Sequence, residues 1–212
     1  IGSNGQLGRS LLTSLPRSYP TAIFCDRQAL DLTQLSSIRA KLENMRPQVI
    51  INASAYTAVD QAEQETELAL AVNRDAVGEI ASYCAAVDAV LIHVSTDYVF
   101  DGAASAPYVE TADTNPRGAY GASKLAGEQA IAASGCRHLI IRTAWVFSPY
   151  GQNFLKTMLR LGGEHDTLSV VADQIGSPTL AGDLAEAIVA TLKPVREGNC
   201  AWGLYHLSLI HI

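Results

Sequence analysis

Gly2-Ser-Asn-Gly5-Gln-Leu-Gly8 is the stretch of this 212-residue chain that indicates its fold. Three glycines at this spacing let the main chain turn tightly and approach a diphosphate, which then rests on the amino end of a helix. Leu11, Leu12 and Leu15 follow at the spacing of such a helix. The alternative is an ordinary glycine-rich loop, and the residues that follow favour a dinucleotide site.

A short strand with an acid at its end is the second part of this pattern. Residues 22–25 are typical of a strand, and Asp26 stands at about the 20-residue spacing expected of an acid that binds the adenosine ribose. Arg27 comes next and could accept the 2′-phosphate of NADP, or could be a solvated surface arginine. The sequence therefore leaves the choice between NADPH and NADH open.

Strand and helix patterns alternate through the rest of the chain. The predicted strands cover residues 22–25, 49–52, 89–94, 139–147, 169–171 and 204–207. The predicted helices follow the glycine turn and then lie between 33 and 47, 65 and 86, 120 and 133, 153 and 161 (ended by Gly162-Gly163), and 183 and 192. This alternation predicts an α/β fold, a doubly wound parallel sheet of the NAD(P)-binding Rossmann type.

The pattern divides the chain into two parts. Residues 1–147 form the predicted dinucleotide-binding Rossmann domain, and residues 148–212 the start of an incomplete C-terminal substrate-binding lobe with returning Rossmann elements. We expect truncated ends, because Ile1 enters the glycine turn directly and residues 209–212 fit no element. A sheet without its first strand would expose apolar neighbours, so we expect these residues alone to fold poorly or to bind cofactor weakly.

Composition excludes several classes of function. A net charge of −6 without any basic run argues against a nucleic-acid binder. No apolar run approaches the ~18 residues of a membrane span, and no signal peptide opens the chain. The four cysteines are scattered, which indicates buried thiols in a reducing cytoplasm, and the five histidines show no metal-ligand spacing.

Tyr120-Gly-Ala-Ser-Lys124 carries the predicted chemistry. A tyrosine and a lysine four residues apart project from one face of a helix. We expect the charge of Lys124 to lower the pKa of Tyr120 toward working pH, so that the phenol can exchange a proton with a carbonyl or alcohol oxygen. Such pairs also occur on solvated helix faces, so the catalytic interpretation needs support from other residues. Ser95-Thr96 gives that support, because it stands at the carboxyl end of a predicted strand, where ligands bind in parallel sheets.

Two further features have an open interpretation. The small-residue turn Ala53–Thr57 would let a flat cofactor approach the main chain, or would simply pack tightly. Asn73 lies within a predicted helix, where asparagine is unfavourable, so it either makes a hydrogen bond or faces water.

These motifs together resemble the extended short-chain dehydrogenase/reductases. Longer strings are similar to the branch of that family that reduces dTDP-linked 4-keto sugars, and they cover residues 52–60, 95–102, 120–128, 142–147, 153–159 and 173–179. The resemblance runs from Gly2 to about Ser208. It implies hydride transfer from NADPH or NADH to the C4 keto group of dTDP-4-dehydro-L-rhamnose, giving dTDP-L-rhamnose for cell-surface polysaccharide.

The resemblance also implies roles for individual residues. Tyr120 would protonate the sugar C4 oxygen, Lys124 would hold the nicotinamide ribose, and Thr96 would bind the substrate carbonyl. The cofactor would contact Gly2, Gly5, Gln6, Leu7, Gly8, Asp26, Arg27, Asp31, Leu32, Ala55, Tyr56, Thr57, Tyr120 and Lys124. The sugar nucleotide would contact Thr96, Asp97, Tyr98, Trp145 and Asn153. Tyr98 could instead be a packed ring, and Trp145 a core residue.

Other functions remain open at this stage. A non-catalytic nucleotide-binding subunit, similar to the regulatory β subunit of methionine adenosyltransferase, is one, and a nucleotide-sugar epimerase or dehydratase is another. Thr96 before Asp97, together with Trp145, fits a reductase better, and no paired carboxylates stand beside Thr96 for elimination. A homodimer and a Mg²⁺ ion are further implications of the resemblance, and the sequence places neither.

Overall fold

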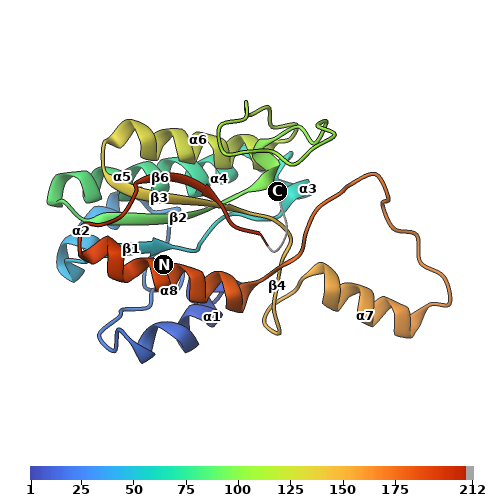
Figure 1. Cartoon of the computed structure of the whole chain (residues 1–212), viewed down its shortest axis with the longest axis horizontal. Helices are drawn as coiled ribbons and strands as arrows, with labels where there is room; N and C mark the ends of the chain where they lie inside the picture. The colour runs from blue at the N-terminus through green and yellow to red at the C-terminus, as the bar shows by residue number, and fades with distance from the viewer. Residues whose placement is uncertain (209–212) are drawn as a thin grey trace.

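Four parallel strands form the central sheet of the computed structural model, which describes residues 1–208 (Figure 1). The strand order is β1 (Val49–Asn52), β2 (Val90–Thr96), β3 (Arg137–Thr143) and β6 (Gly203–His206). Asn52 pairs with His93 in register, and Thr96 pairs with Thr143. The carboxyl ends of the strands therefore meet at one edge, as ligand sites in such sheets require.

Helical elements connect these strands. Their bounds are α1 (Gln6–Ser14), η1 (Leu15–Arg17), α2 (Leu35–Met45), α3 (Val59–Ala62), α4 (Thr66–Leu70), η2 (Ala71–Asp75), α5 (Ala76–Val87), η3 (Asp97–Val99), α6 (Ala119–Ser134), α7 (Phe154–Glu164) and α8 (Ala181–Arg196). A second, two-stranded parallel sheet pairs β4 (Val146–Phe147) with β5 (Thr179–Leu180). The predicted α/β architecture is confirmed.

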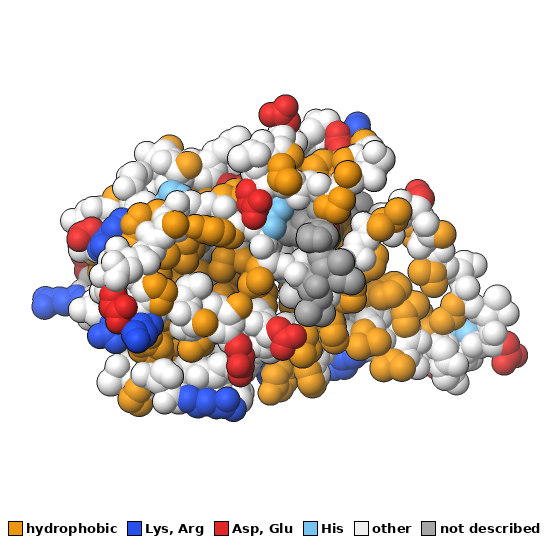
Figure 2. Space-filling model, viewed as in Figure 1, with side chains coloured by type: hydrophobic (Ala, Val, Ile, Leu, Met, Phe, Trp, Pro, Cys, Tyr) orange, Lys and Arg blue, Asp and Glu red, His pale blue; other side chains and the backbone are white. Residues whose placement is uncertain are grey.

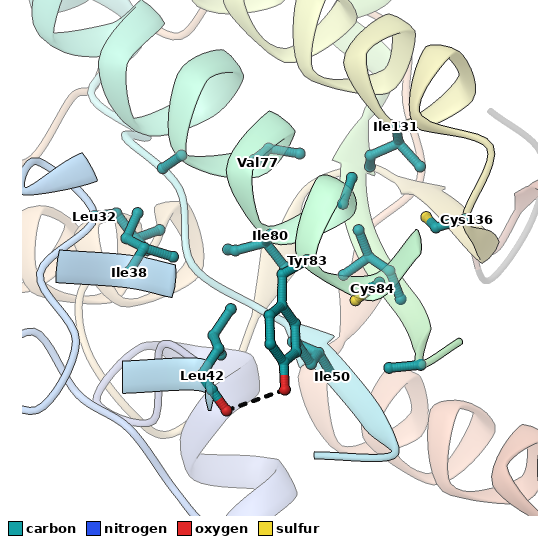
Figure 3. Close-up of a cluster of buried hydrophobic side chains, with 14 of the residues drawn as sticks. Leu32, Ile38, Leu42, Ile50, Val77, Ile80, Tyr83, Cys84, Ile131 and Cys136 are labelled. Carbon is teal, nitrogen blue, oxygen red and sulfur yellow. Dashed lines mark hydrogen bonds between the residues drawn. The ribbon is translucent and has the colours of Figure 1, made fainter. Parts of the chain in front are cut away.

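Apolar clusters flank both faces of the sheet, because successive side chains of a strand point to opposite faces. Leu91 and Ile140 join the cluster under α2, α5 and α6, where the Tyr83 hydroxyl donates to the Leu42 carbonyl at 3.1 Å (Figure 3). Ile92 joins the cluster under α1 and α8. In Figure 1 α6 lies above the sheet and α1 and α8 lie below it, which is the doubly wound arrangement.

Residues 1–3 lie between β1 and residues 22–25. The Ile1 nitrogen donates to the Ile51 carbonyl at 2.8 Å, and the nitrogens of Gly2 and Ser3 donate to the Cys25 carbonyl at 2.8 and 3.1 Å. These contacts do not make residues 22–25 a strand, so the predicted strand is wrong. A groove of about 420 Å³ lies alongside, lined by residues that include Phe24 and Val49, and none of the predicted catalytic side chains lines it.

The structure corrects three details of the prediction. Residues 169–171 form no strand, and Val171 is exposed because no neighbouring strand of the described residues pairs with it. α7 continues through Gly162-Gly163 to Glu164, because glycine disfavours a helix without preventing it. The apolar run 139–147 is interrupted between β3 and β4 by Trp145, whose φ of 46° turns the chain.

The segment that carries α7 extends away from the sheet (Figure 1). None of the α7 residues is buried, and Phe154 and Leu159 are exposed on it. Figure 2 shows hydrophobic side chains gathered along this extension. Within residues 1–208, no helix has both the length and the apolar character needed to cross a bilayer.

Candidate active site

The glycine turn lies at the carboxyl edge of the sheet and leads into α1. Gly2 has a φ of 88°, and a Cβ added there would lie 2.8 Å from the Ser54 nitrogen. A Cβ added to Gly8 would lie 2.0 Å from the Gly2 carbonyl oxygen. The helix begins after Gly5 without a side-chain cap, so the amides of its first turn are available to an anionic group. The turn thus fits a dinucleotide diphosphate.

Asp26 lies beside this turn, as the spacing predicts. The Asn4 amide donates to its carboxylate at 3.4 Å, and Asp26 also accepts from the Ala29 nitrogen at 3.0 Å. The Arg27 side chain is 80% exposed and lies 3.7 Å from the Asp31 carboxylate. Hydrogen bonds from Thr33 hold the pKa of Asp31 below its usual range. The two charged residues predicted to bind the adenosine end of the cofactor, Asp26 and Arg27, therefore both stand next to the Asp31 turn and near the glycine turn.

The side chains of three predicted cofactor residues make contacts within the protein fold. Leu7 and Leu32 are buried in the two apolar clusters. The Gln6 amide donates to the Val146 carbonyl at 3.2 Å, and its oxygen accepts from the Asn153 amide at 2.9 Å. These three can contact a nucleotide through their backbone, whereas their side chains hold the fold.

The turn after β1 is fixed by Asn73. Its amide exchanges two hydrogen bonds with the backbone of Tyr56 and a third with the Ser123 hydroxyl. The Tyr56 hydroxyl donates to Glu65 at 2.8 Å, and Thr57 is exposed. Asn73 lies in η2, a π-helical turn between α4 and α5, so the mid-helix asparagine is hydrogen-bonded and does not face water.

Thr96, Asp97, Tyr98 and Tyr120 come together where β2 ends. The Thr96 hydroxyl donates to Asp97 at 3.0 Å and accepts from the Tyr98 nitrogen at 3.2 Å. The Tyr98 and Tyr120 rings meet edge to face, with their centroids 5.5 Å apart. Burial raises the pKa of Tyr120 to about 12, against the opposing effect of a hydrogen bond with the Thr96 side chain. Burial also raises the pKa of Asp97.

Lys124 does not act on Tyr120 as the sequence predicts. Its Nζ donates to the Val94 carbonyl at 2.7 Å and lies 3.2 Å from His93 Nε2. Burial lowers the pKa of Lys124 to about 8, against the opposing charge of Glu128. The expected fall in the pKa of Tyr120 is thus wrong for this structure, because burial of the phenol dominates and the amine is directed to β2.

A buried ion pair holds α6 against the sheet one turn after Lys124. Arg142 on β3 donates to both carboxylate oxygens of Glu128, at 3.0 and 2.7 Å, and the Ser95 hydroxyl donates to the same carboxylate. Both charged side chains are at most 5% exposed. This two-bond contact fixes how far Tyr120 and Lys124 stand from β2.

Trp145 lies between β3 and β4, and Asn153 lies between β4 and α7. The Trp145 ring is 41% exposed and packs against Gly176, where an added Cβ would lie 2.8 Å from the ring. Asn153 caps α7 by accepting from the Lys156 nitrogen at 3.0 Å, and its amide donates to Gln6 and to the Ser148 carbonyl. Trp145 thus presents an open aromatic face, whereas the Asn153 side chain is occupied within the fold.

Comparison with known proteins identifies the family of this arrangement. The family model described as RmlD substrate binding domain matches residues 1–210. The dTDP-4-dehydrorhamnose reductase of Sinorhizobium fredii is 43% identical over 209 residues, which cover 98% of this chain and 70% of the relative. The chain belongs to the dTDP-4-dehydrorhamnose reductase family. Its Escherichia coli K12 relative of the same name is 40% identical over 210 residues, which cover 98% and 70% of the two chains.

Solved structures agree with this family. The dTDP-4-dehydrorhamnose reductase from Bacillus anthracis, solved in complex with NADP, has a TM-score of 0.90 at 42% identity, with 98% of this chain and 72% of that chain covered. A UDP-glucose 4-epimerase from Brucella ovis has a TM-score of 0.78 at 17% identity, covering 98% and 75%, and shares the fold alone.

Sequence reasoning missed several polar residues that this member of the family buries around its site. Asn52 and His93 are both fully buried, and Glu128 and Arg142 nearly so. A signal was present, since polar residues inside otherwise apolar strands are seldom buried without a partner. Among residues 1–208, no three His, Cys, Asp or Glu side chains gather as a metal site.

Proposed function

We propose that this protein is an NAD(P)H-dependent reductase that converts the C4 keto group of dTDP-4-dehydro-L-rhamnose to the alcohol of dTDP-L-rhamnose. The observation that carries the proposal is the meeting of the Thr96 hydroxyl and the Tyr120 phenol at the carboxyl edge of the sheet. The family names of the relatives support the substrate class.

Tyr120 is suited to be the acid. Its pKa of about 12 keeps the phenol protonated at neutral pH, so it can donate to a carbonyl oxygen as negative charge develops there. Thr96 can turn its proton from Asp97 to the same oxygen. A bound nicotinamide cofactor supplies the hydride for the carbon. The oxygen would then take its proton from Tyr120, which leaves the oxidised cofactor and a Tyr120 phenolate that regains a proton before the next turnover.

The glycine turn and its surroundings are suited to hold the cofactor. Gly2 and Gly8 leave no room for a side chain, which brings the backbone close to the diphosphate. Asp26 would accept from the ribose of NADH, and Arg27 would donate to the 2′-phosphate of NADPH. We favour NADPH, since a relative at 42% identity was solved with NADP.

The sugar nucleotide would lie over the exposed aromatic side chains at the same edge. Trp145 is 41% and Tyr98 is 39% exposed, and both flat faces suit the apolar face of a deoxysugar. Asp97 would accept from a sugar hydroxyl. A sugar contact by Asn153 would require it to give up one of its hydrogen bonds.

The test is NADPH oxidation followed by absorbance, with dTDP-4-dehydrorhamnose as substrate. Tyr120→Phe should lower kcat by about 100-fold or more, as loss of a general acid does. Tyr205→Phe is the matched control, because Tyr205 lies on β6 and its hydroxyl donates to the Ala201 carbonyl. Equal activity of the Tyr120→Phe protein and the wild type would refute the assigned acid.

The same assay separates the competing functions. A binding subunit would bind NADPH without oxidising it, and an epimerase or dehydratase would change the sugar without net NADPH loss. A relative from Streptomyces niveus, 41% identical, is named dTDP-4-keto-6-deoxy-D-glucose reductase, so that sugar should be compared as a second substrate.

The surroundings of the reaction belong to the same proposal. We place the protein in the cytoplasm, supported by four free cysteines. A homodimer and a Mg²⁺ requirement stay predictions, which sedimentation and assay in the presence of a chelator would test.

A further inference from the structure

Trp145 has a backbone conformation that residues with a side chain rarely adopt. Its φ is 46°, in the left-handed region, where the Cβ crowds the following carbonyl oxygen. Within residues 1–208, the other non-glycine residues with a positive φ are Arg46 and Asp88, and each of them ends a helix. Trp145 ends no helix, since it lies between β3 and β4. A bulky residue keeps such a conformation where its surroundings determine it, and such residues cluster at binding sites.

Residues 176–179 hold Trp145 through both its backbone and its side chain. The Thr179 nitrogen donates to the Trp145 carbonyl at 3.2 Å, and β4 pairs with β5 directly after it. The indole lies against Gly176, where an added Cβ would lie 2.8, 3.0 and 3.2 Å from Cε2, Cζ2 and Nε1 of the ring. The ring therefore occupies the space that a side chain at position 176 would need.

The backbone that follows Gly176 is anchored. Ser177 and Thr179 are both buried, and the Ser177 carbonyl accepts from the Ser208 hydroxyl at 3.5 Å. Gly176 is not one of the glycines with a positive φ, so the lack of a side chain there is required by the ring and not by a turn of the chain. Because the Trp145 residue is 41% exposed, we expect the indole, and not the anchored backbone, to move when a side chain is added.

The indole stands at the same edge of the sheet as the Thr96 hydroxyl. Thr143, the last residue of β3, pairs in register with Thr96, and Trp145 follows Thr143 by two residues. An indole is a large, rigid surface that suits an apolar sugar face, and its position decides which sugar it can pack against. The residue that fixes the ring is therefore a candidate determinant of sugar recognition.

We propose that Gly176 is a positioning residue that fixes the Trp145 indole for the sugar part of the substrate, and that it acts on neither the dTDP part, the cofactor nor the hydride step. Its role in sugar binding rests on the proposed function, whereas its effect on the ring does not. A ring that packs on the sugar binds the ground state and the transition state alike. Displacing the ring should therefore raise KM for the sugar nucleotide and leave kcat unchanged.

Fluorescence tests the effect on the ring without any substrate. The chain has two tryptophans, so Trp202→Phe leaves Trp145 as the only reporter. In that background, Gly176→Ala should shift the emission maximum and change the quenching by acrylamide, because the ring moves. Gly162→Ala is the matched control, since nothing lies within 4 Å of its added Cβ on α7, and it should change neither. Identical emission and quenching in the Gly176→Ala protein and its parent would overturn the proposal.

Titration with two ligands tests which part of the substrate depends on residue 176. Gly176→Ala should raise the Kd for dTDP-L-rhamnose about tenfold, the effect of losing one well-packed contact. It should leave the Kd values for dTDP and for NADPH unchanged, because neither ligand carries the sugar. Equal weakening of dTDP and dTDP-L-rhamnose binding would contradict the assignment to the sugar.

Kinetics of a double variant separate an effect through the ring from a general loosening of the segment. Gly176→Ala should raise KM for dTDP-4-dehydro-L-rhamnose about tenfold at unchanged kcat. Trp145→Ala should raise KM at least as much, and in that background Gly176→Ala should add nothing, because the ring that it displaces is absent. Additive effects, or a loss confined to kcat, would refute the proposal. If the wild type lacks turnover but Gly176→Ala changes the Trp145 fluorescence as expected, the proposed function fails and the positioning of the ring stands.

Discussion

The side-chain amide of Asn73 and the backbone of Tyr56 exchange two hydrogen bonds, at 2.9 and 3.0 Å. A third bond, at 2.9 Å, reaches Ser123 on α6. The π-helical turn that carries Asn73 thus joins the loop after β1 to the helix that carries Tyr120 and Lys124. One asparagine therefore fixes the distance between the expected cofactor loop and the acid.

Asn73→Ala should destabilise the protein by about 3 kcal/mol, because it leaves the backbone N–H and C=O of Tyr56 without their partners and removes the bond that Ser123 accepts. Urea unfolding measures the change. Asn199→Ala is the control, since that residue is exposed, and it should change the free energy of unfolding by less than about 0.5 kcal/mol. Similar losses in both variants would contradict the assigned role.

Gly127→Ala should also be destabilising, by about 1–3 kcal/mol, since the added Cβ would lie 2.1 Å from the Asn73 carbonyl oxygen. Gly163→Ala offers the opposite result in another helix, where nothing lies within 4 Å of the added Cβ. There the free energy of unfolding should increase by about 0.5–1 kcal/mol, because alanine loses less conformational entropy on folding than glycine does. Thermal unfolding of the two variants in parallel checks both signs.

Lys124 should make stability rise with pH. Its pKa is about 8 in the folded protein, against an ordinary value of 10.5 for the unfolded chain, so between these values the unfolded chain binds one proton more. The free energy of unfolding should increase by about 3 kcal/mol across this range. Below pH 8 both states bind the proton, so Lys124 adds no pH dependence to the stability there. Lys124→Met should lack the increase. A wild type and variant with parallel profiles would show that the amine titrates alike in both states.

Arg27→Ala should weaken NADPH and spare NADH. A charge-assisted hydrogen bond to the 2′-phosphate is lost, which corresponds to a rise in KM of about tenfold. Arg17→Ala is the matched control, because Arg17 is also exposed and makes a similarly long ion pair, with Glu186 at 3.8 Å. An equal effect on both cofactors would show that Arg27 does not recognise the 2′-phosphate.

The sequence was sufficient for those parts that depend on local patterns. Glycine spacing predicted the turn at Gly2–Gly8, and apolar runs predicted β1, β2, β3 and β6. These patterns follow from backbone sterics and from burial of strands on both faces, which leave few alternatives. Tyr120 and Lys124 also lie on one helix as their spacing requires.

Contacts between distant segments could not be read in the same way. The direction of Lys124 is set by contacts with His93 and Val94, about thirty positions earlier in the chain. The run Ser169–Val171 has strand-forming residues, yet a strand also needs a neighbour to accept its hydrogen bonds. Both outcomes are set by tertiary pairing, which residue type alone does not specify.

Gln6 connects the glycine turn to the segment from which α7 begins. It stands in the first turn of α1, beside the glycines, while its side chain holds Val146, Ser148 and Asn153, from which α7 begins. A change that adapts the glycine turn to another nucleotide therefore also shifts the corner that leads to the sugar-facing segment. We therefore expect a substitution of Gln6 to change the proposed cofactor site and the proposed sugar site together.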